Sequence, residues 1–237
     1  MIYITGDTHR DITRFRNLKS MYDITLNPED YIIICGDFGF IYCDNEFERK
    51  LLDELENFPY TVLWVDGNHE NFNVLNDNER YSVEEWNGGK VHRIRKNVLH
   101  LMRGQVFVVE GKKIFTMGGA YSIDRAIGGE NISYWEAELP SKEECEEARR
   151  NLAANDNKVD IIITHTAPKK IITEKFYCDP HEKEVVFLEF LESVMNKCEF
   201  KEWYFGHWHE DRTFEVTINE KKKIFNAMLD DVLKIEV

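Results

Sequence analysis

Residues 31–39 read YIIICGDFG, an apolar run that leads directly into glycine and aspartate. A short run rich in Ile and bounded by glycine is typical of a strand buried on both faces of a sheet. The same pattern recurs in IYIT (2–5), TVLWV (61–65), KIFTM (113–117), DIIIT (160–164) and EWYF (202–205). The sequence therefore predicts a sheet-based core in which each strand feeds a loop.

Segments with helical periodicity lie between these strands. They are 44–57, with Phe47, Leu51, Leu52 and Leu55 expected inward; 141–154, which begins with the capping box Ser141 to Glu144; and 183–197, which carries Val186, Leu188, Phe190, Leu191 and Val194. Residues 91–117 resemble successive hairpins, and residues 213–237 resemble a hairpin followed by a last strand. Strands that alternate with helices, with added hairpins, predict a layered α/β fold with mixed sheets.

The composition predicts one folded domain that covers residues 1–237, since 43% of the residues are hydrophobic and 31% are charged. The opening residues MIYITGD have no basic region or cleavage site of a signal peptide, and no apolar run is long enough to span a bilayer. The five cysteines are odd in number and scattered. These features favour a cytoplasmic protein without a membrane segment.

The net charge of −14 disfavours a protein that grips long duplex nucleic acid. A basic stretch, from Lys90 to Arg103, is interpreted as a solvated hairpin face, because short basic runs are common on ordinary surfaces. The longest irregular segment is 118–140, GGAYSIDRAIGGENISYWEAELP. We expect it near the functional site, because long loops in compact domains are often functional.

Polar and ionisable residues follow the predicted strands at the points where the strands end. They are Asp7 and His9 in GDTH, Asp37 in GDFG, Asn68 and His69 in GNHE, His165 in THTAP, and His207 and His209 in GHWH. Each motif alone is an ordinary turn, but all of them stand at strand ends. Because the carboxyl ends of strands in open α/β sheets converge on one crevice, we expect these side chains to form one cluster.

The chemistry of this cluster points to metal ions. Imidazole, carboxylate and amide ligands without a thiolate suit divalent manganese, iron, zinc, cobalt or nickel. The donors are too many for a single ion, and a carboxylate shared between two ions accounts for their number. Two metals about 3.5 to 4 Å apart clamp the attacking and leaving oxygens of a phosphoryl displacement. The sequence therefore predicts a two-metal site.

The ordered series GDTH, GDFG, GNHE, TH and GHWH resembles the signature blocks of the calcineurin-like metallophosphoesterase superfamily, and the resemblance runs from residue 5 to about 210. It implies two mixed β-sheets packed as a sandwich and flanked by helices, in four layers. It also implies a metal-dependent phosphoester hydrolase. Manganese is the favoured metal. The expected substrate is a small or nucleotide-type phosphodiester or phosphomonoester.

The resemblance also implies roles for individual residues. One ion would be held by Asp7, His9, Asp37 and His209, and the other by Asp37, Asn68, His165 and His207. Asp37 would thus bridge the ions. His69 stands next to a ligand without being one, and would act as the general acid toward the leaving group.

The second block departs from that of the serine/threonine protein phosphatases in this superfamily. Their GD-x-x-D-R pattern has Phe40 and Ile41 at its last two positions here, and Arg10 replaces the glycine that usually ends their first block. Protein phosphatase activity of that type is therefore disfavoured. Without the phosphate-binding Arg of that pattern, Arg10 and Arg125 become the candidates for contacting phosphoryl oxygens through a guanidinium fork.

Two alternatives remain open at this stage. One is a non-catalytic scaffold with the same fold, which the presence of every ligand position and of His69 disfavours. The other is a nuclease acting on single strands, in which the basic stretch and the aromatic residues Tyr121, Tyr134 and Trp135 would track the strand. The net charge favours a small substrate instead.

Overall fold

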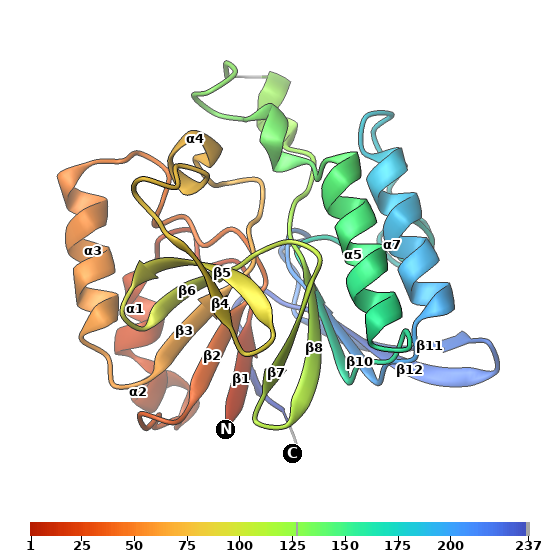
Figure 1. Ribbon diagram of the computed structural model, residues 1–237, viewed down its shortest axis with the longest axis horizontal. Helices are drawn as coiled ribbons and strands as arrows, with labels where there is room; N and C mark the ends of the chain where they lie inside the picture. Colours follow the sequence, from red (N-terminus) through yellow and green to blue (C-terminus); the bar gives the residue numbers. More distant parts are fainter. Residues whose placement is uncertain (127, 236–237) are drawn as a thin grey trace.

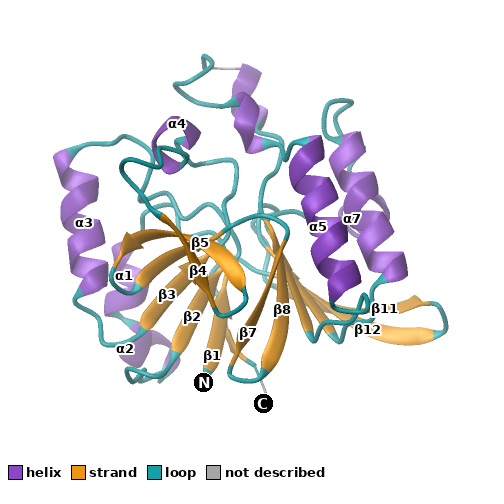
Figure 2. Cartoon of the chain, viewed as in Figure 1, coloured by secondary structure: helices purple, strands orange, loops and turns teal. Residues whose placement is uncertain are grey.

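The computed structural model of the protein describes residues 1–126 and 128–235. Two mixed sheets face each other, and helices cover the outer face of each (Figures 1 and 2). The predicted four-layer sandwich is thus confirmed. None of the helices in the described ranges combines the length and apolarity that a membrane crossing requires.

The first sheet has seven strands, and most of them come from the N-terminal half of the chain. Their order is β13 (Val232–Lys234), β1 (Ile2–Thr5), β2 (Tyr31–Ile34), β3 (Thr61–Trp64), β6 (Val98–Leu101), β5 (Gly89–Arg95) and β4 (Val83–Trp86). Strands β1, β2, β3 and β6 run parallel. The helices of this half are α1 (Ile12–Arg16), α2 (Leu18–Tyr22), α3 (Glu46–Glu56) and the short α4 (Phe72–Leu75), of which α1 to α3 stand to the left of the sheet in Figure 1.

The second sheet has six strands. Their order is β11 (Arg212–Ile218), β12 (Lys221–Ala227), β10 (Glu202–Phe205), β9 (Ile161–Thr164), β8 (Lys112–Met117) and β7 (Gln105–Val109). The helices of this half are α5 (Lys142–Ala154), the short α6 (Lys169–Ile171) with a π-turn at Ile172–Phe176, and α7 (Val185–Lys197). Two short 3-10 turns, Ile123–Ala126 and Glu136–Glu138, lie in the segment 118–140.

Alternation along the strands explains why the helices and the sheets stack in this order. In β1, Ile2 and Ile4 join the core between the sheets, whereas Tyr3 packs on the helical side. In β9, Ile161 lies between the sheets and Ile162 lies under the helices. Because successive side chains of a strand point to opposite faces, an all-apolar strand fills two cores at once.

The predicted strands are confirmed to within a residue at each end, and Ser141 caps α5 through a capping box with Glu144 as expected. The inward position predicted for Phe47 is wrong, because its side chain is 61% exposed. Glu48 is buried in α3 instead, where its carboxylate accepts backbone N–H groups of residues 42 to 44. Val186 of α7 is also exposed, and Phe187 is buried beside it.

The basic stretch is only partly the solvated face that the sequence predicted. Lys90, Arg93 and Arg95 pair with the acids Glu147, Glu84 and Asp53, respectively. The interpretation is wrong for three further residues, because His92, His100 and Arg103 are buried. For the two histidines the reason is the pairing of β5 with β6, which sets them opposite each other with their Nδ1 atoms 3.0 Å apart.

The buried Arg103 connects the end of β3 to the segment 118–140. Its guanidinium donates to Asp66 Oδ2 from Nε at 2.8 Å and from Nη2 at 2.6 Å. Nη2 also donates to the carbonyl oxygens of Ala137 and Glu138. His100 Nε2 lies 3.1 Å from the other carboxylate oxygen of Asp66. One fork of donors therefore satisfies a buried carboxylate and fixes the position of a long loop.

Replacing Arg103 by Met should destabilise the protein by about 3–5 kcal/mol, because the Asp66 carboxylate would stay buried without its cationic partner. Arg95→Met is the matched control. Arg95 pairs with the exposed Asp53, so its loss should cost less than about 1 kcal/mol. Urea unfolding followed by circular dichroism measures both free energies. Equal losses in the two variants would contradict a structural role for the buried pair.

Candidate metal centre

The residues singled out at strand ends come together where the carboxyl ends of the central strands of both sheets meet. The loops after β1, β2 and β3 supply them from the first sheet, and the loops after β9 and β10 supply them from the second. In Figure 1 these loops lie above the strands, and both chain termini lie at the opposite end. Segments up to two hundred residues apart in the sequence thus form one cluster.

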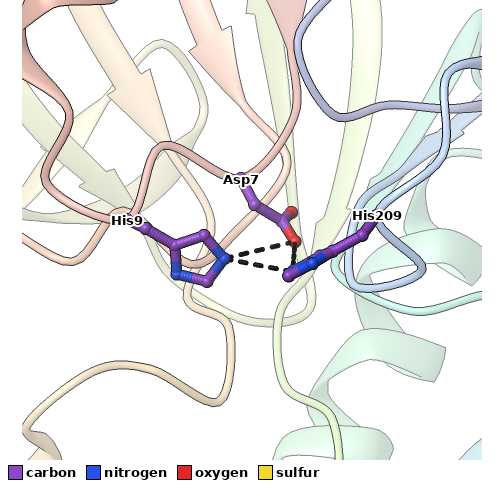
Figure 3. Close-up of side chains that lie close together, drawn as sticks. All are labelled: Asp7, His9 and His209. Carbon is purple, nitrogen blue, oxygen red and sulfur yellow. Dashed lines mark hydrogen bonds and ion pairs between the residues drawn. The ribbon is translucent and has the colours of Figure 1, made fainter.

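Asp7, His9 and His209 form one group of donors (Figure 3). His9 Nε2 lies 3.1 Å from His209 Nε2 and 3.9 Å from Asp7 Oδ2. His209 Nε2 lies 3.4 Å from the same carboxylate oxygen. The three side chains point to one small space, which they approach from the first loop and from the loop after β10.

His165 is the centre of a second group. Its Nδ1 donates to the carbonyl oxygen of Cys35 at 2.8 Å, which leaves Nε2 directed at the other side chains. Nε2 lies 3.1 Å from Asn68 Oδ1 and 3.3 Å from Asp37 Oδ1. The ring of His207 lies edge-on to that of His165, with a centroid distance of 5.1 Å.

Asp37 lies between the two groups. Its Oδ1 faces His165, and its Oδ2 lies 3.8 Å from His9 Nε2. The backbone N–H of His69 donates to Oδ1 at 2.8 Å and fixes the carboxylate in this orientation. With one oxygen toward each group, this carboxylate contacts both sets of donors.

The donor atoms fit divalent metal ions in spacing and in kind. Ligands that surround an ion at about 2.1 Å lie about 3.0 to 3.4 Å from one another. His209 Nε2 lies 3.1 Å from His9 Nε2 and 3.4 Å from Asp7 Oδ2, and His165 Nε2 lies 3.1 Å from Asn68 Oδ1 and 3.3 Å from Asp37 Oδ1, all within this range. The separation of 3.9 Å between His9 Nε2 and Asp7 Oδ2 is longer. The cluster also buries the carboxylates of Asp7 and Asp37 with no Lys or Arg among the contacts described for them.

The electrostatics of the cluster follow from this burial. Burial opposes a charge on Asp37, but the adjacent His165 outweighs it and holds the pKa of Asp37 well below its usual range. Burial likewise opposes a charge on His165, yet Asp37 raises the pKa of that imidazole. Burial and the neighbouring His165 lower the pKa of His207 to about 3, so His207 is neutral and can donate a lone pair to a metal.

The backbone of the cluster adopts conformations that cost energy. His9, Asp37, His207 and His209 have positive φ angles of 43°, 46°, 69° and 48°. Left-handed conformations cost roughly 1–2 kcal/mol for residues with a Cβ. Hydrogen bonds between loops hold these conformations. The amide of His9 donates to the Asp37 carbonyl oxygen, and the amide of His207 donates to the Asp7 carboxylate. Strain of this kind is concentrated at functional sites.

Two motif glycines are required by close approach. A Cβ on Gly67 would lie 2.1 Å from Asp37 Oδ1, and a Cβ on Gly206 would lie 2.0 Å from Asp7 Oδ1. Each glycine therefore makes room for a carboxylate that belongs to a different motif. Each of these two motifs thus contributes both a donor residue to the cluster and the space that a carboxylate from another motif needs.

His69 stands beside the donor groups, and its ring centroid is 5.1 Å from that of His9. It lines two hollows. One is a cavity of about 550 Å³, which also reaches Asp37, Asn68, His207 and His209, and the other is a smaller one of about 220 Å³, shared with His9 and Arg10. A side chain in this position can reach a group bound at the donor cluster from the side.

Arg10 and Arg125 differ in their surroundings. Arg10 lines the smaller hollow, and its Nη1 donates to Glu48 at 2.6 Å while the side chain stays one-third exposed. Arg125 is nearly buried and donates to Glu138, to Glu136 and to the Trp135 carbonyl. Arg10 is therefore adjacent to the cluster, whereas the guanidinium of Arg125 belongs to the framework of the segment 118–140.

Sequence reasoning overlooked two acidic residues of the site. Glu70 follows His69 and is fully buried, and its carboxylate accepts the amides of Phe38 and Gly39 at 2.7 and 3.2 Å. Burial and the nearby Asp37 raise its pKa well above the usual value. Its place within GNHE was a signal that could have identified it. Glu184 lines the larger cavity, and no motif marks it in the sequence.

Comparisons with known proteins place this structure among others of similar fold. Curated protein sequences give no significant match. Among solved structures, phosphopantetheinyl hydrolase from Mycobacterium tuberculosis is 15% identical with a TM-score of 0.47, over 96% of this chain and 89% of that one. A putative 5'-nucleotidase from Staphylococcus aureus is 12% identical with a TM-score of 0.53, over 99% of this chain and 51% of that one. At 12% identity, the likeness to the second protein shows the fold alone.

The family comparison covers most of the chain. The profile described as calcineurin-like phosphoesterase matches residues 1–211, a range that contains every strand-end motif of the cluster. That family is metal-dependent, and the Asp and His groups brought together here could bind metal. This chain therefore belongs to the calcineurin-like phosphoesterase family and is a phosphoester hydrolase.

Proposed function

We propose that this phosphoester hydrolase works with two divalent metal ions, Asp37 bridging them, on a small or nucleotide-type phosphodiester or phosphomonoester. The observation that carries the proposal is the position of Asp37, with one oxygen facing His9 and the other facing His165. Asp7, His9 and His209 complete one set of ligands, and Asn68, His165 and His207 complete the other. Manganese is the metal we favour, and iron, zinc, cobalt and nickel suit the same donors.

When bound, the two ions would supply a water of lowered pKa and positive charge beside the phosphoryl oxygens. Asp37 and Asp7 would offset part of the positive charge of the ions, and the amide of His69 holds Asp37 in place. The Cys35 carbonyl keeps His165 in the tautomer that presents Nε2.

His69 is proposed to protonate the oxygen of the leaving group as the ester bond breaks. His69 lies beside His9 and lines both hollows, which supports this role because an ester bound at the cluster would have its leaving oxygen within reach. Proton transfer of this kind contributes on the order of 10² to 10⁴ in rate. Arg10 is proposed to contact a phosphoryl oxygen, since it lines the smaller hollow with His69.

A nuclease tracking single strands is less well supported. Such proteins use a basic groove with unpaired cations along the backbone of the strand. In this protein, Lys90, Arg93 and Arg95 pair with acids, and Arg103 is buried. The basic stretch therefore offers little positive surface, and a small substrate remains our proposal.

The direct test is turnover by the manganese-loaded protein on a panel of p-nitrophenyl phosphate, bis-p-nitrophenyl phosphate, cyclic nucleotides, dinucleotide polyphosphates and short oligonucleotides. We expect hydrolysis of at least one small ester and loss of activity on chelation. Tight metal binding without turnover on any ester would support a scaffold instead.

Asp37→Asn should lower the occupancy of both metal sites, because the neutral amide loses the charge that the two ions share. We expect the metal content to fall from about two ions per chain to well below one. Inductively coupled plasma mass spectrometry measures the content, and Asp53→Asn, an exposed carboxylate elsewhere, is the control. Retention of both ions in Asp37→Asn would disprove the bridging role.

His69→Gln should keep both metals and lose turnover, by about 10²-fold or more for esters with poor leaving groups. The loss should be much smaller for nitrophenyl esters, because nitrophenolate departs without a proton. The measurement is kcat for a series of aryl and alkyl esters plotted against the pKa of the leaving group. An equal loss along the series would remove the general-acid role from His69.

Arg10→Gln should lower kcat/KM on every substrate of the panel by roughly tenfold or more, as expected when a charge-assisted hydrogen bond to phosphate is lost. Glu48 keeps three backbone donors in this variant, so the fold should persist. Arg125→Gln should act selectively on larger substrates, through the loop that it holds. Unchanged constants in both variants would leave phosphate binding to the metals alone.

A further inference from the structure

The larger cavity has a wall that the metal-binding residues do not account for. Its volume of about 550 Å³ is in the range of small-molecule sites. One side is the donor cluster with His69. The other side is built from Tyr121, Ile172, Pro180, His181, Glu184 and Trp208, which come from the segment 118–140, the region between β9 and α7, and the loop after β10.

Glu184 is the unusual member of this wall. Its side chain lies at the start of α7 and the residue is only 8% exposed. The hydrogen bond described for its carboxylate is a long one, 3.4 Å, from the amide of Tyr121. Burial is the main cause that raises the pKa of Glu184 to about 7. A carboxylate in such a position is costly unless a partner completes its hydrogen bonds.

Glu138 shows how this chain treats a buried carboxylate that serves the framework. It is fully buried and accepts from the amide of Ser122 at 2.9 Å and from Arg125 Nε at 2.8 Å. Glu184 lies close by in the same region, bonded to the amide of the residue that precedes Ser122. Glu138 therefore has good hydrogen bonds from within the chain, whereas the one described for the Glu184 carboxylate is long. Glu184 thus has acceptor capacity left for a ligand.

An aromatic pair adjoins this carboxylate. The rings of Tyr121 and His181 stack with centroids 4.1 Å apart and planes 10° apart. The guanidinium of Arg125 lies over the Tyr121 ring at 4.9 Å, and Glu138 and Glu136 hold that guanidinium in place. The pair is therefore fixed before a ligand arrives, which lowers the entropic cost of binding.

We propose that Glu184 and the Tyr121–His181 pair form a recognition site for the organic arm of the substrate, a flat group that carries N–H or O–H donors, as a nucleoside does. This inference rests on the proposed function, because the metal centre at the other side of the cavity would hold the phosphoryl group. The ring of such an arm packs on the aromatic and apolar wall. One of its donors completes the hydrogen bonds of the Glu184 carboxylate.

The acceptors of the wall select against other arms. An arm that bears a carboxylate would place its acceptor oxygens against those of Glu184, and the ionised form of Glu184 would repel it in a site of low dielectric. An arm without donors would leave the buried carboxylate as poorly satisfied as it is in the free protein. The site thus separates phosphoesters by the hydrogen-bonding character of the arm that does not react.

Adenosine is a suitable probe, because it has a flat ring and several donors but no phosphoester to be hydrolysed. Isothermal titration calorimetry of the manganese-loaded protein should show adenosine binding. Glu184→Ala should weaken adenosine binding by about tenfold or more, as loss of a hydrogen bond to a charged group predicts. Glu184→Gln should weaken it less, since the amide keeps an acceptor. Tyr121→Leu should weaken it through lost ring contact.

The control is Glu182→Gln, an exposed carboxylate two residues before Glu184, which should leave adenosine binding unchanged. Thermal melts establish that each variant is folded. Equal affinity for adenosine in wild type, Glu184→Ala and Tyr121→Leu, or no adenosine binding in wild type, would overturn the recognition site.

The proposed function fails separately from this inference. Hydrolysis of bis-p-nitrophenyl phosphate with no adenosine binding would keep the hydrolase and remove the recognition site. Adenosine binding that depends on Glu184, without hydrolysis of any ester, would keep the site and remove the proposed reaction. As a second readout, the ratio of kcat/KM for thymidine 5'-p-nitrophenyl phosphate over p-nitrophenyl phosphate should fall in Glu184→Ala and stay constant in Glu182→Gln.

Discussion

A buried carboxylate, that of Asp37, is the constraint on which the rest of this structure depends. It has no Lys or Arg among its described contacts, and imidazoles and one amide surround it instead. The loop after β1 bonds to the Asp37 carbonyl through the amides of Thr8 and His9. Gly67 must lack a side chain so that the carboxylate fits. The centre therefore fixes the relative positions of three loops of the first sheet and of His165 from the second.

The buried acidic residues differ in how fully the chain satisfies them, and the difference separates framework from function. Arg103 donates hydrogen bonds to the carboxylate of Asp66, and Arg125 donates one to that of Glu138. The Glu70 carboxylate accepts two backbone amides. Asp37 and Glu184 keep lone pairs directed at a cavity. Since an unsatisfied buried acceptor costs free energy, we infer that stability is given up for binding at these two positions.

The hydrogen bonds of Arg103 and Arg125 also explain how the segment 118–140 is held beside the candidate metal centre. Arg103 binds the carbonyl oxygens of Ala137 and Glu138 from its place next to Asp66, two residues before Asn68. Glu138 in turn holds Arg125, which lies over Tyr121. Hydrogen bonds of Arg103 and Arg125, followed by the contact of the Arg125 guanidinium with the Tyr121 ring, thus connect the end of β3 to the wall of the larger cavity. The position of Tyr121 is tied to the same strand that presents Asn68 and His69.

The sequence by itself determined the strands, most of the helices and the family, because these depend on local patterns. Apolar runs that end in Gly-Asp, Gly-Asn-His or Gly-His-Trp-His predict both the strand and the candidate metal-donor residue that follows it. Topology then required those donors to meet, since strand ends converge at a sheet edge. The exposure of Phe47 was missed because its inward place on α3 went to Glu48, whose partners lie in the preceding loop.

Only the tertiary structure decided which residues of the basic stretch are buried and which residues line the cavity wall. His92, His100 and Arg103 look like surface residues in sequence, yet strand pairing and Asp66 bury them. Glu184 looks like one more acidic residue before a helix, and it becomes a buried acceptor because the segment 118–140 covers it. Partners separated by tens of residues leave no period or motif in the chain, so burial and pairing of this kind are properties of the fold.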